Sequence, residues 1–480
     1  MLGKFGEWRQ WFAGGIIAAL ATAPVVAATV YIAPNGDDSR SGLTPAQAMA
    51  TLKNAQSRVA PGDTIEIAGG TYPWVEGTWI YVSGTASKRI VIRAAVVAGK
   101  SQVVTIRGDN RAGRPNNYCL GTGSVWLEIR SITCENFAEF GILIYGGHDI
   151  RLLNNTLRQL GNSGIAIYSD LVDRRQAYGV LVSSNIITDT NRRWAQTSGV
   201  SGWGQGISVF GDNNVIRFNR ISQTYGEGIG VAGVGNQAIG NTISDSCSVG
   251  LYLDTASNAV AERNFVIQGV SAASQAFFAT CQITSSSNGG PAFGTGIQIA
   301  SETSSYTTIT APRLTGNIIR NNVVINGRVG LQYGNYGFDA GGGDGMRNTI
   351  IANNIFVGGR ERAILIENGR RSVHAGNVIA NNIFYWTGAP AGDPVAIDGA
   401  AGLRFSHNLW FGLAAGPAQG LGDELGDPRF ANVAGTRPSA FVPAAASPAR
   451  GAGDVMYRPA DDFNGAVRGA AVDIGAFVIP

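Results

Sequence analysis

The hydrophobic and polar residues between positions 204 and 268 follow a pattern that recurs three times at nearly constant spacing. The repeats begin at Gly206, Gly228 and Gly250, so successive repeats start 22 residues apart. After each glycine, apolar residues alternate with small or polar ones, as a β-strand with one buried face requires. Two further apolar positions follow in every repeat and indicate three short strands per unit. Such a period predicts a solenoid, because each unit can bury its apolar face only against the next one.

Asparagines recur at two points of each repeat. One series is Asn214, Asn236 and Asn258, the other is Asn219, Asn241 and Asn264, and the same Asn-x-apolar signature occurs at Asn155, Asn185, Asn322, Asn354, Asn382 and Asn408. Asparagine suits a sharp turn between strands, because it tolerates the left-handed backbone region and forms local hydrogen bonds. In coils stacked at the strand spacing of roughly 4.8 Å, these residues can form a ladder of amide hydrogen bonds. The pattern predicts an all-β parallel β-helix in which the asparagines are structural.

The N-terminal residues differ from the repeats and predict export. Lys4 and Arg9 precede an apolar run over 11–26, and two small residues then suit cleavage before Thr29. We therefore expect residues 1–28 to be a signal peptide, with an uncleaved anchor as the alternative.

The remaining chain divides into three predicted regions. We expect an N-terminal cap and first coils over 29–110, coils with loop insertions over 111–415, and C-terminal coils with a cap over 416–480. A helix is predicted over 45–58, with Thr44 as its N-cap and proline at its first position. An open solenoid end exposes apolar core, so we expect this helix to cover it.

Composition changes this picture only slightly. Glycine accounts for 67 of 480 residues, about twice the usual share of roughly 7%, which suits many tight turns. The net charge of +3 and a charged fraction of 14% argue against a nucleic-acid partner. The four cysteines either pair as sequence neighbours, Cys119 with Cys134 and Cys247 with Cys281, or remain buried thiols. The sequence leaves both arrangements open.

Motifs at both ends resemble a known superfamily. They are Tyr31 to Asp38, Pro61-Gly-Asp-Thr-Ile65, Gly69-Gly-Thr-Tyr72, Ser447-Pro-Ala-Arg-Gly-Ala-Gly453 and Val472-Asp-Ile-Gly-Ala-Phe477. These runs resemble the start and the close of secreted right-handed parallel β-helix proteins of the pectate-lyase-like, carbohydrate-active type. The resemblance implies that fold with a short capping helix. It also implies, for a lyase, a Lys or Arg base and a calcium ion that neutralises a uronate. No lysine occurs after Lys100, so the coils contain arginine but no lysine. Only the arginine version of the lyase base therefore fits the coils.

Strand alternation selects the side chains that point away from the core. Stacked aromatic residues at outward positions would form a strip against which sugar rings can lie, or a ladder that only stabilises the sheet. The substrate-binding candidates are Tyr145, Tyr168, Trp194, Trp203, Phe210 and Tyr252. Outward positions farther along the chain hold Gln298, Gln332, Glu367 and Asp398.

Carboxylates and arginines of the central coils are the catalytic candidates. They are Asp212, Glu227, Asp254, Arg174 and Arg192. A lyase would use an Arg or Tyr base, with calcium held by Asp212, Asp254 or Glu227, whereas a hydrolase would use two of the carboxylates as acid and base or nucleophile. For each carboxylate, capping of a turn is the simpler alternative.

These features predict a protein that is secreted or periplasmic and cleaves a polysaccharide, most plausibly an acidic one. Elimination by a lyase is favoured slightly over hydrolysis on the same scaffold. A non-catalytic glycan-binding or envelope scaffold is the third alternative. We expect a monomer with no nucleic-acid partner and no membrane span after signal cleavage. Calcium is the one expected cofactor, and no metal ligands are assigned.

Overall fold

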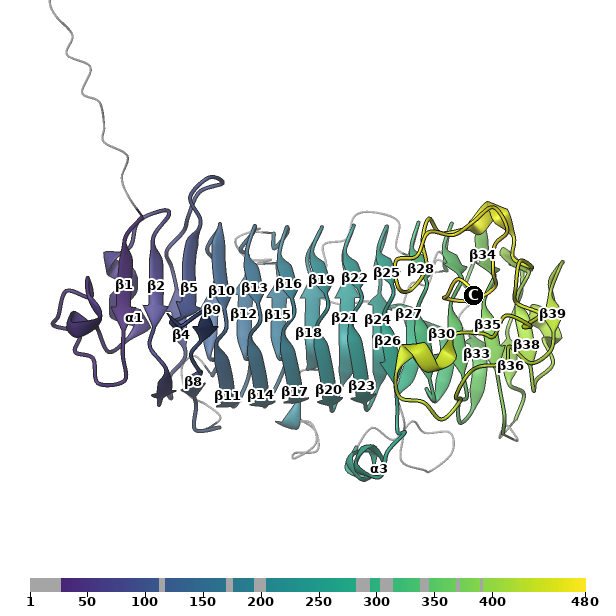
Figure 1. Ribbon diagram of the computed structural model, residues 1–480, viewed down its shortest axis with the longest axis horizontal. Helices are drawn as coiled ribbons and strands as arrows, with labels where there is room; N and C mark the ends of the chain where they lie inside the picture. The colour runs from purple at the N-terminus through teal and green to yellow at the C-terminus, as the bar shows by residue number, and fades with distance from the viewer. Residues whose placement is uncertain are drawn as a thin grey trace, which may run out of the picture.

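The chain forms one elongated stack of coils (Figure 1). The computed structural model describes residues 27–111, 117–169, 176–193, 204–281, 294–302, 314–336, 345–367, 372–388 and 392–480. The predicted signal peptide lies almost entirely outside these residues.

Three parallel sheets run the length of the stack, and each coil contributes one strand to each sheet. Sheet A contains β1 (Thr29–Ile32), β2 (Thr64–Ile67), β5 (Ile90–Ala94), β10 (Leu127–Arg130), β13 (Arg151–Leu153), β16 (Leu181–Ser183), β19 (Val215–Arg217), β22 (Gln237–Ile239), β25 (Val260–Glu262), β28 (Ile318–Arg320), β31 (Ile350–Ala352), β34 (Asn377–Ala380) and β37 (Leu403–Ser406). Sheet B contains β3 (Gly70–Tyr72), β8 (Val104–Arg107), β11 (Thr133–Phe137), β14 (Thr156–Leu160), β17 (Ile186–Thr190), β20 (Arg220–Thr224), β23 (Thr242–Ser246), β26 (Phe265–Ile267), β29 (Val323–Ile325), β32 (Ile355–Val357), β35 (Ile383–Tyr385), β38 (Leu409–Phe411) and β39 (Glu424–Leu425). Sheet C contains β4 (Thr78–Ile80), β9 (Leu120–Thr122), β12 (Ile142–Tyr145), β15 (Ile165–Tyr168), β18 (Gln205–Phe210), β21 (Glu227–Ala232), β24 (Val249–Asp254), β27 (Thr295–Ser301), β30 (Val329–Asn335), β33 (Arg362–Ile366) and β36 (Val395–Ile397). The predicted parallel β-helix is confirmed.

A few elements lie outside these sheets. They are the hairpin β6 (Val96–Val97) and β7 (Lys100–Ser101), the helices α1 (Leu52–Ala55) and α3 (Ala272–Phe278), and the 3-10 turns η1 (Pro45–Gln47), η2 (Gln56–Arg58), η3 (Gly416–Ala418), η4 (Pro438–Phe441) and η5 (Val455–Tyr457).

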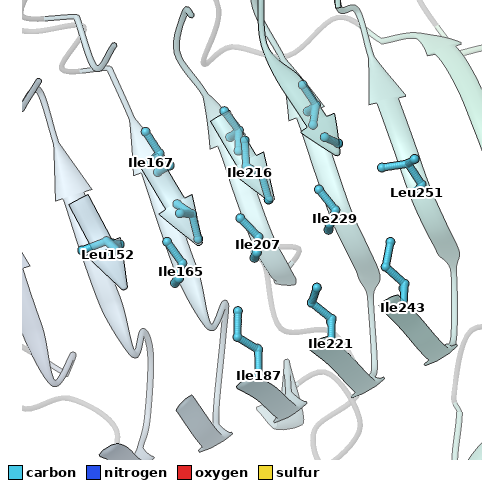
Figure 2. Close-up of a cluster of buried hydrophobic side chains, with 14 of the residues drawn as sticks. Leu152, Ile165, Ile167, Ile187, Ile207, Ile216, Ile221, Ile229, Ile243 and Leu251 are labelled. Atoms are coloured by element: carbon cyan, nitrogen blue, oxygen red, sulfur yellow. The ribbon is translucent and has the colours of Figure 1, made fainter. Parts of the chain in front are cut away.

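Columns of aliphatic side chains fill the interior. Figure 2 shows one such column, in which Ile165, Ile207, Ile229 and Leu251 occupy equivalent positions of consecutive coils. All four side chains are fully buried. Burying each one stabilises the fold by about 1.5–3 kcal/mol relative to exposure, so the stack is held together mainly by its apolar interior.

The predicted asparagine ladder is present at the turn between sheets A and B. Each side-chain amide donates to the side-chain oxygen of the next asparagine over the series Asn155, Asn185, Asn219, Asn241, Asn264, Asn322, Asn354, Asn382 and Asn408. The other predicted series is correct only for Asn214 and Asn236. Asn258 is exposed and lies one residue off the ladder, because the third repeat is one residue longer. Ala259 takes its place and donates its backbone N–H to Asn317.

The predicted single helix over 45–58 is wrong. The segment begins with η1 after Thr44, whose side chain makes no capping hydrogen bond, and the helical conformation then stops at Ala48. Met49 pairs with the first strand, because its N–H donates to Tyr31 and its carbonyl accepts from Ala33. Helix α1 starts only after that bridge. A strand-like backbone contact therefore outweighs helix propensity at this position.

The C-terminal segment does more than close the last coil. It runs back along the stack, as the yellow trace in Figure 1 shows, and packs Ile474 and Phe477 onto the outer face of sheet B. The buried guanidinium of Arg468 fixes it there by donating to Asn321 Oδ1 (3.0 Å) and to Gly475 O (2.8 Å). Apolar outward residues of the last sheet B strands are thereby covered.

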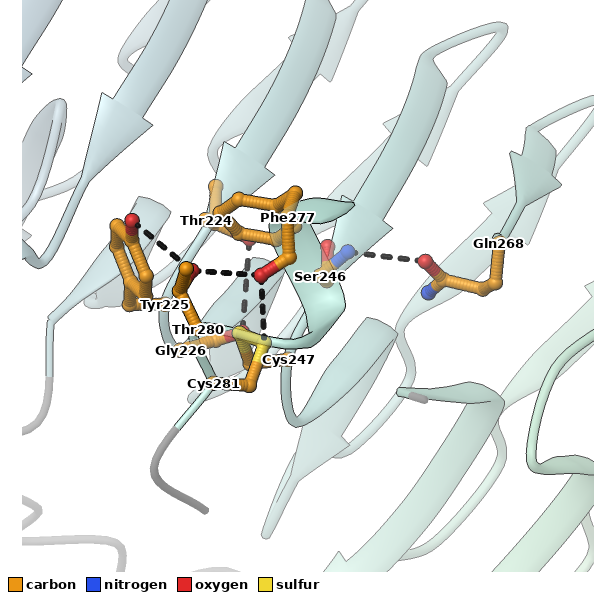
Figure 3. The surroundings of a disulfide bond; sticks show 9 residues. All are labelled: Thr224, Tyr225, Gly226, Ser246, Cys247, Gln268, Phe277, Thr280 and Cys281. Carbon is orange, nitrogen blue, oxygen red and sulfur yellow. Dashed lines mark hydrogen bonds between the residues drawn. A yellow bond between two sulfur atoms is a disulfide. The ribbon is translucent and has the colours of Figure 1, made fainter. Parts of the chain in front are cut away.

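Both candidate disulfides are formed. Cys119 pairs with Cys134 and Cys247 pairs with Cys281, with Cα–Cα distances of 5.9 and 5.8 Å. The second bond ties α3 to the end of β23, where Phe277 packs against Cys247 (Figure 3). This tether precedes β24, whose outward residues belong to the site described next.

Candidate functional site

The outer face of sheet C begins one residue earlier than alternation predicts. A Cβ on Gly206 would lie 2.6 Å from Ile221 Cγ2 in the core, so this glycine points inward at the bend between sheets B and C. Gln205 consequently lies on the outer face, where its amide covers Gly230 of the next coil. Glu227 pairs with Gln205 and is placed in the same way.

Two rows of outward residues cross the strands of sheet C in register. The first row is Tyr145, Tyr168, Phe210, Ala232, Asp254, Ala300, Gly334, Glu367 and Asp398. The second row is Leu143, Ala166, Ser208, Gly230, Tyr252, Gln298, Gln332, Leu365 and Ala396. Aromatic residues occupy the N-terminal part of the first row and carboxylates occupy its C-terminal part.

Carboxylates converge on the hydroxyl group of Tyr252. This hydroxyl donates to Glu302 Oε1 at 2.5 Å, and Thr255 Oγ1 lies 2.8 Å from Asp254 Oδ1 and 2.9 Å from Glu302 O. Burial, followed by the negative charges of Asp254, Glu302 and Glu227, raises the pKa of Tyr252 well above its ordinary value of 10.0. Tyr252 therefore stays protonated at neutral pH and acts as a hydrogen-bond donor.

A second tyrosine, Tyr336, contacts two glutamine side-chain amides on the neighbouring coils. The Tyr336 hydroxyl accepts hydrogen bonds from Gln298 Nε2 (3.0 Å) and Gln332 Nε2 (3.3 Å). Burial raises the pKa of Tyr336 to about 12, with smaller contributions from the charges of Glu367 and Glu302. The hydroxyl therefore remains protonated at neutral pH, and the charges of two carboxylates act on it.

Arginines accompany the carboxylates at the C-terminal end of this face. Arg328 forms an ion pair with Glu361 at 3.0 Å. Burial and the charge of Asp398 raise the pKa of Glu367, while Arg328 and Arg362 oppose that rise. The polar cluster formed by β27, β30 and β33 therefore contains both signs of charge.

The cluster has a buried part and a partly exposed part. Glu227, Tyr252 and Asp254 are only 4%, 4% and 6% exposed. They point away from the core but do not face water, contrary to the prediction from alternation. Glu302 and Glu367 are half-buried and Asp398 is exposed, so an external ligand can reach these three carboxylates.

The structure separates the predicted catalytic residues. It brings Glu227 and Asp254 to the Tyr252 cluster, five residues apart along the strand direction, as predicted. Asp212 lies at the turn between sheets C and A, where its Oδ1 accepts from Val234 N at 2.8 Å. Arg192 pairs with Asp189 at 3.4 Å after β17. Asp212 and Arg192 are thus engaged outside the cluster.

The predicted aromatic strip is partly assembled. Tyr145, Tyr168 and Phe210 are lateral neighbours, and the last two rings meet edge to face with centroids 5.4 Å apart. Tyr252 belongs to the second row instead. Arg174, Trp194 and Trp203 lie outside the described residues.

Several residues of the cluster were not found from sequence. Glu302, Arg328 and Tyr336 lie just beyond strand ends, where alternation no longer gives a direction. The signal that could have found them is their position next to the outward glutamines at Gln298 and Gln332.

The expected calcium ion has no ready set of ligands. Within the part of the chain that the structure describes, no group of three or more His, Cys, Asp or Glu side chains is arranged to hold a metal ion. No chemical step is therefore assigned to a metal.

Comparison with known proteins agrees with this architecture. Residues 196–410 match the family described as right handed beta helix region. The pectate lyase PEL9 of Emericella nidulans is 35% identical over 139 residues, which cover 29% of this chain and 31% of that protein. The chain is therefore similar to right-handed parallel β-helix proteins of the pectate-lyase-like type. The match spans only about a third of the length of this curated relative.

Solved β-helix structures superimpose over most of the chain. Pectate lyase Pel9A gives a TM-score of 0.53 at 16% identity, covering 94% of this chain and 96% of its own. XylC in complex with xylose gives 0.59 at 11% identity, covering 94% and 98%. The Agl-KA catalytic domain gives 0.52 at 14% identity, covering 84% and 68%. At these identities the likeness establishes the β-helix fold alone.

Proposed function

We propose that this β-helix protein cleaves an acidic polysaccharide on the outer face of sheet C, by elimination. The observation that carries the proposal is the half-buried pair of carboxylates Glu302 and Glu367, whose charges act on the Tyr336 hydroxyl held by Gln298 and Gln332. The similarity to a pectate lyase, 35% over 139 residues, supports the reaction class.

The cluster supplies the groups that elimination requires. Arg328 and Arg362 bear the positive charge that pairs with a uronate carboxylate. Glu367 in its ionised form takes the proton from the carbon beside that carboxylate, and its raised pKa makes it a stronger base than an ordinary glutamate. The electron pair forms the new carbon–carbon double bond as the bond to the leaving oxygen breaks. Tyr336 then donates its proton to that oxygen.

Hydrolysis is the second candidate, and one observation favours it. Glu367 and Glu302 have different surroundings, since burial raises the pKa of Glu367 whereas Glu302 accepts a hydrogen bond from Tyr252. Two carboxyl groups whose environments differ in this way suit a protonated acid and an ionised partner.

A panel of pectate, alginate and xylan tests both reactions. Elimination produces a double bond conjugated to a carboxyl group, which absorbs in the ultraviolet, whereas hydrolysis produces reducing ends without that absorbance. Glu367→Gln should lower kcat by about 10²–10⁴-fold for either reaction, and Glu302→Gln should do so for hydrolysis. Glu424→Gln, at a half-buried carboxylate on sheet B, is the matched control. Cleavage that is unaffected by both site variants would place the chemistry elsewhere, and binding without any product would leave a glycan-binding scaffold. Addition of a chelator to the same assay tests the calcium prediction.

Export belongs to the same proposal. Cleavage before Thr29 would remove the predicted signal peptide and release the β-helix outside the cytoplasm. No helix within the described part of the chain is long and apolar enough to cross a membrane. N-terminal sequencing of exported protein should find Thr29 first, and a mature chain that keeps residues 11–26 would indicate an anchor.

A further inference from the structure

The outer face of sheet C has a neutral aromatic half on the N-terminal side of the polar cluster. Trp79 lies on β4, which is the first strand of this sheet, and Tyr81 follows one residue after that strand. Continuing the pairing of Ile80 with Thr122 places Tyr81 at the head of the first register row.

The rings at this end are exposed and fixed in place. Trp79 is 36% exposed and Tyr81 is 58% exposed. Trp79 packs edge to face against Tyr118 with ring centroids 6.0 Å apart. The two rings close over Gly121, where an added Cβ would lie 2.6 Å from an atom of each ring. The glycine thus lets the Trp79 ring lie flat against the sheet.

Among the described residues, the outward positions between this end and the polar cluster carry no charge. The outward residues from β4 to β18 are Trp79, Tyr81, Gly121, Gly123, Leu143, Tyr145, Ala166, Tyr168, Ser208 and Phe210. Side chains of this kind combine apolar ring faces with hydroxyl groups, which is the chemistry that matches a sugar ring. Sheet C needs four strand-to-strand steps to reach β18 from β4. At roughly 4.8 Å per step the tract is about 19 Å long.

We infer that this aromatic tract, from Trp79 and Tyr81 to Phe210, binds a run of sugar residues of the same polysaccharide that extends from the cleavage cluster toward the N-terminal end of the stack. The inference rests on the proposed function. Because the described side chains of the tract carry no charge, they bind ring faces, whereas Arg328 and Arg362 at the cluster recognise carboxylates. The protein therefore acts on long chains far better than on short fragments.

Exposed rings at the far end of the tract provide the test. Tyr81→Ala should weaken binding of the polymer about fivefold, as expected for one lost aromatic contact, and raise KM for the polymer without changing kcat. Binding of trimeric fragments should not change, because a trimer at the cluster does not reach Tyr81. Tyr81→Phe keeps the ring and should bind the polymer like the wild type. Phe218→Ala is the control, since Phe218 is 57% exposed but lies at the turn between sheets A and B.

Pectate and alginate polymers and their trimers are the probes, with binding measured by affinity electrophoresis and cleavage by product formation. Equal polymer binding by Tyr81→Ala and wild type, with cleavage intact, overturns the tract and leaves the proposed function standing. Polymer binding that depends on Tyr81 without any cleavage supports the tract and overturns the proposed reaction. Absence of both binding and cleavage overturns both.

Discussion

Truncation of one asparagine in the middle of the ladder should destabilise the whole stack measurably. The Asn241 side chain is fully buried and donates to Ile216 O (2.9 Å) and to Asn264 Oδ1 (3.0 Å). Its own Oδ1 accepts from the backbone N–H and the side-chain amide of Asn219, at 3.0 and 2.9 Å. Asn241→Ala removes these four hydrogen bonds and leaves the two Asn219 donors without an acceptor.

The expected cost follows from those four contacts. At about 1 kcal/mol of net stability for each buried hydrogen bond, the free energy of unfolding should fall by about 4 kcal/mol. Equilibrium urea unfolding followed by circular dichroism measures the change. Asn213→Gly is the control in the preceding coil, because Asn213 is exposed and has a φ of 53° that glycine adopts readily. We expect that control to stay within about 0.5 kcal/mol of the wild type. A loss below about 1 kcal/mol in Asn241→Ala would refute the structural role of the ladder.

Two further predictions concern pH and the disulfide beside the site. Burial lowers the pKa of His374 from 6.5 to about 4, and its neutral ring accepts a hydrogen bond from Met346 N. As pH falls, the unfolded chain therefore takes up this proton before the folded chain does. The free energy of unfolding is full above pH 6.5 and declines toward pH 4, by about 3 kcal/mol in all. In urea unfolding across this range, His374→Phe should lose this dependence of stability on pH. Replacing both Cys247 and Cys281 by serine opens a cross-link over 34 residues and should cost about 3 kcal/mol, seen as a lower Tm and faster proteolysis near α3, whereas an unchanged Tm would contradict the tether.

The fold was predictable because one physical constraint repeats in every coil. Alternating apolar residues and turn asparagines identified the β-helix. The misplaced Asn258 lies only one residue from the ladder position that Ala259 occupies. Local exceptions were not predictable. Backbone pairing of Met49 with the first strand broke the expected capping helix, and the inward Gly206 moved Gln205 and its neighbour Glu227 to the outer face.

The site was predictable only in part, since its members are brought together by coil-to-coil register. Asp254 and Ala300 are direct neighbours across sheet C although 46 residues separate them in sequence. Insertions of unequal length between the strands hide that register from the spacing of the sequence. Sequence reasoning therefore centred the site on the earlier coils. Glu302, Glu367 and Asp398, which a ligand can reach, lie farther toward the C-terminus.

The unbroken register of sheet C also sets the distance between the aromatic half and the acidic half of its outer face. Each coil contacts only the coils on either side, so duplication or loss of one complete coil between β18 and β24 would shift the aromatic half from the acidic half by one increment of roughly 4.8 Å. Neither half would need a new side chain. The distance between the two halves can thus change through the number of coils. The reaction chemistry can change independently, through single substitutions in the cluster.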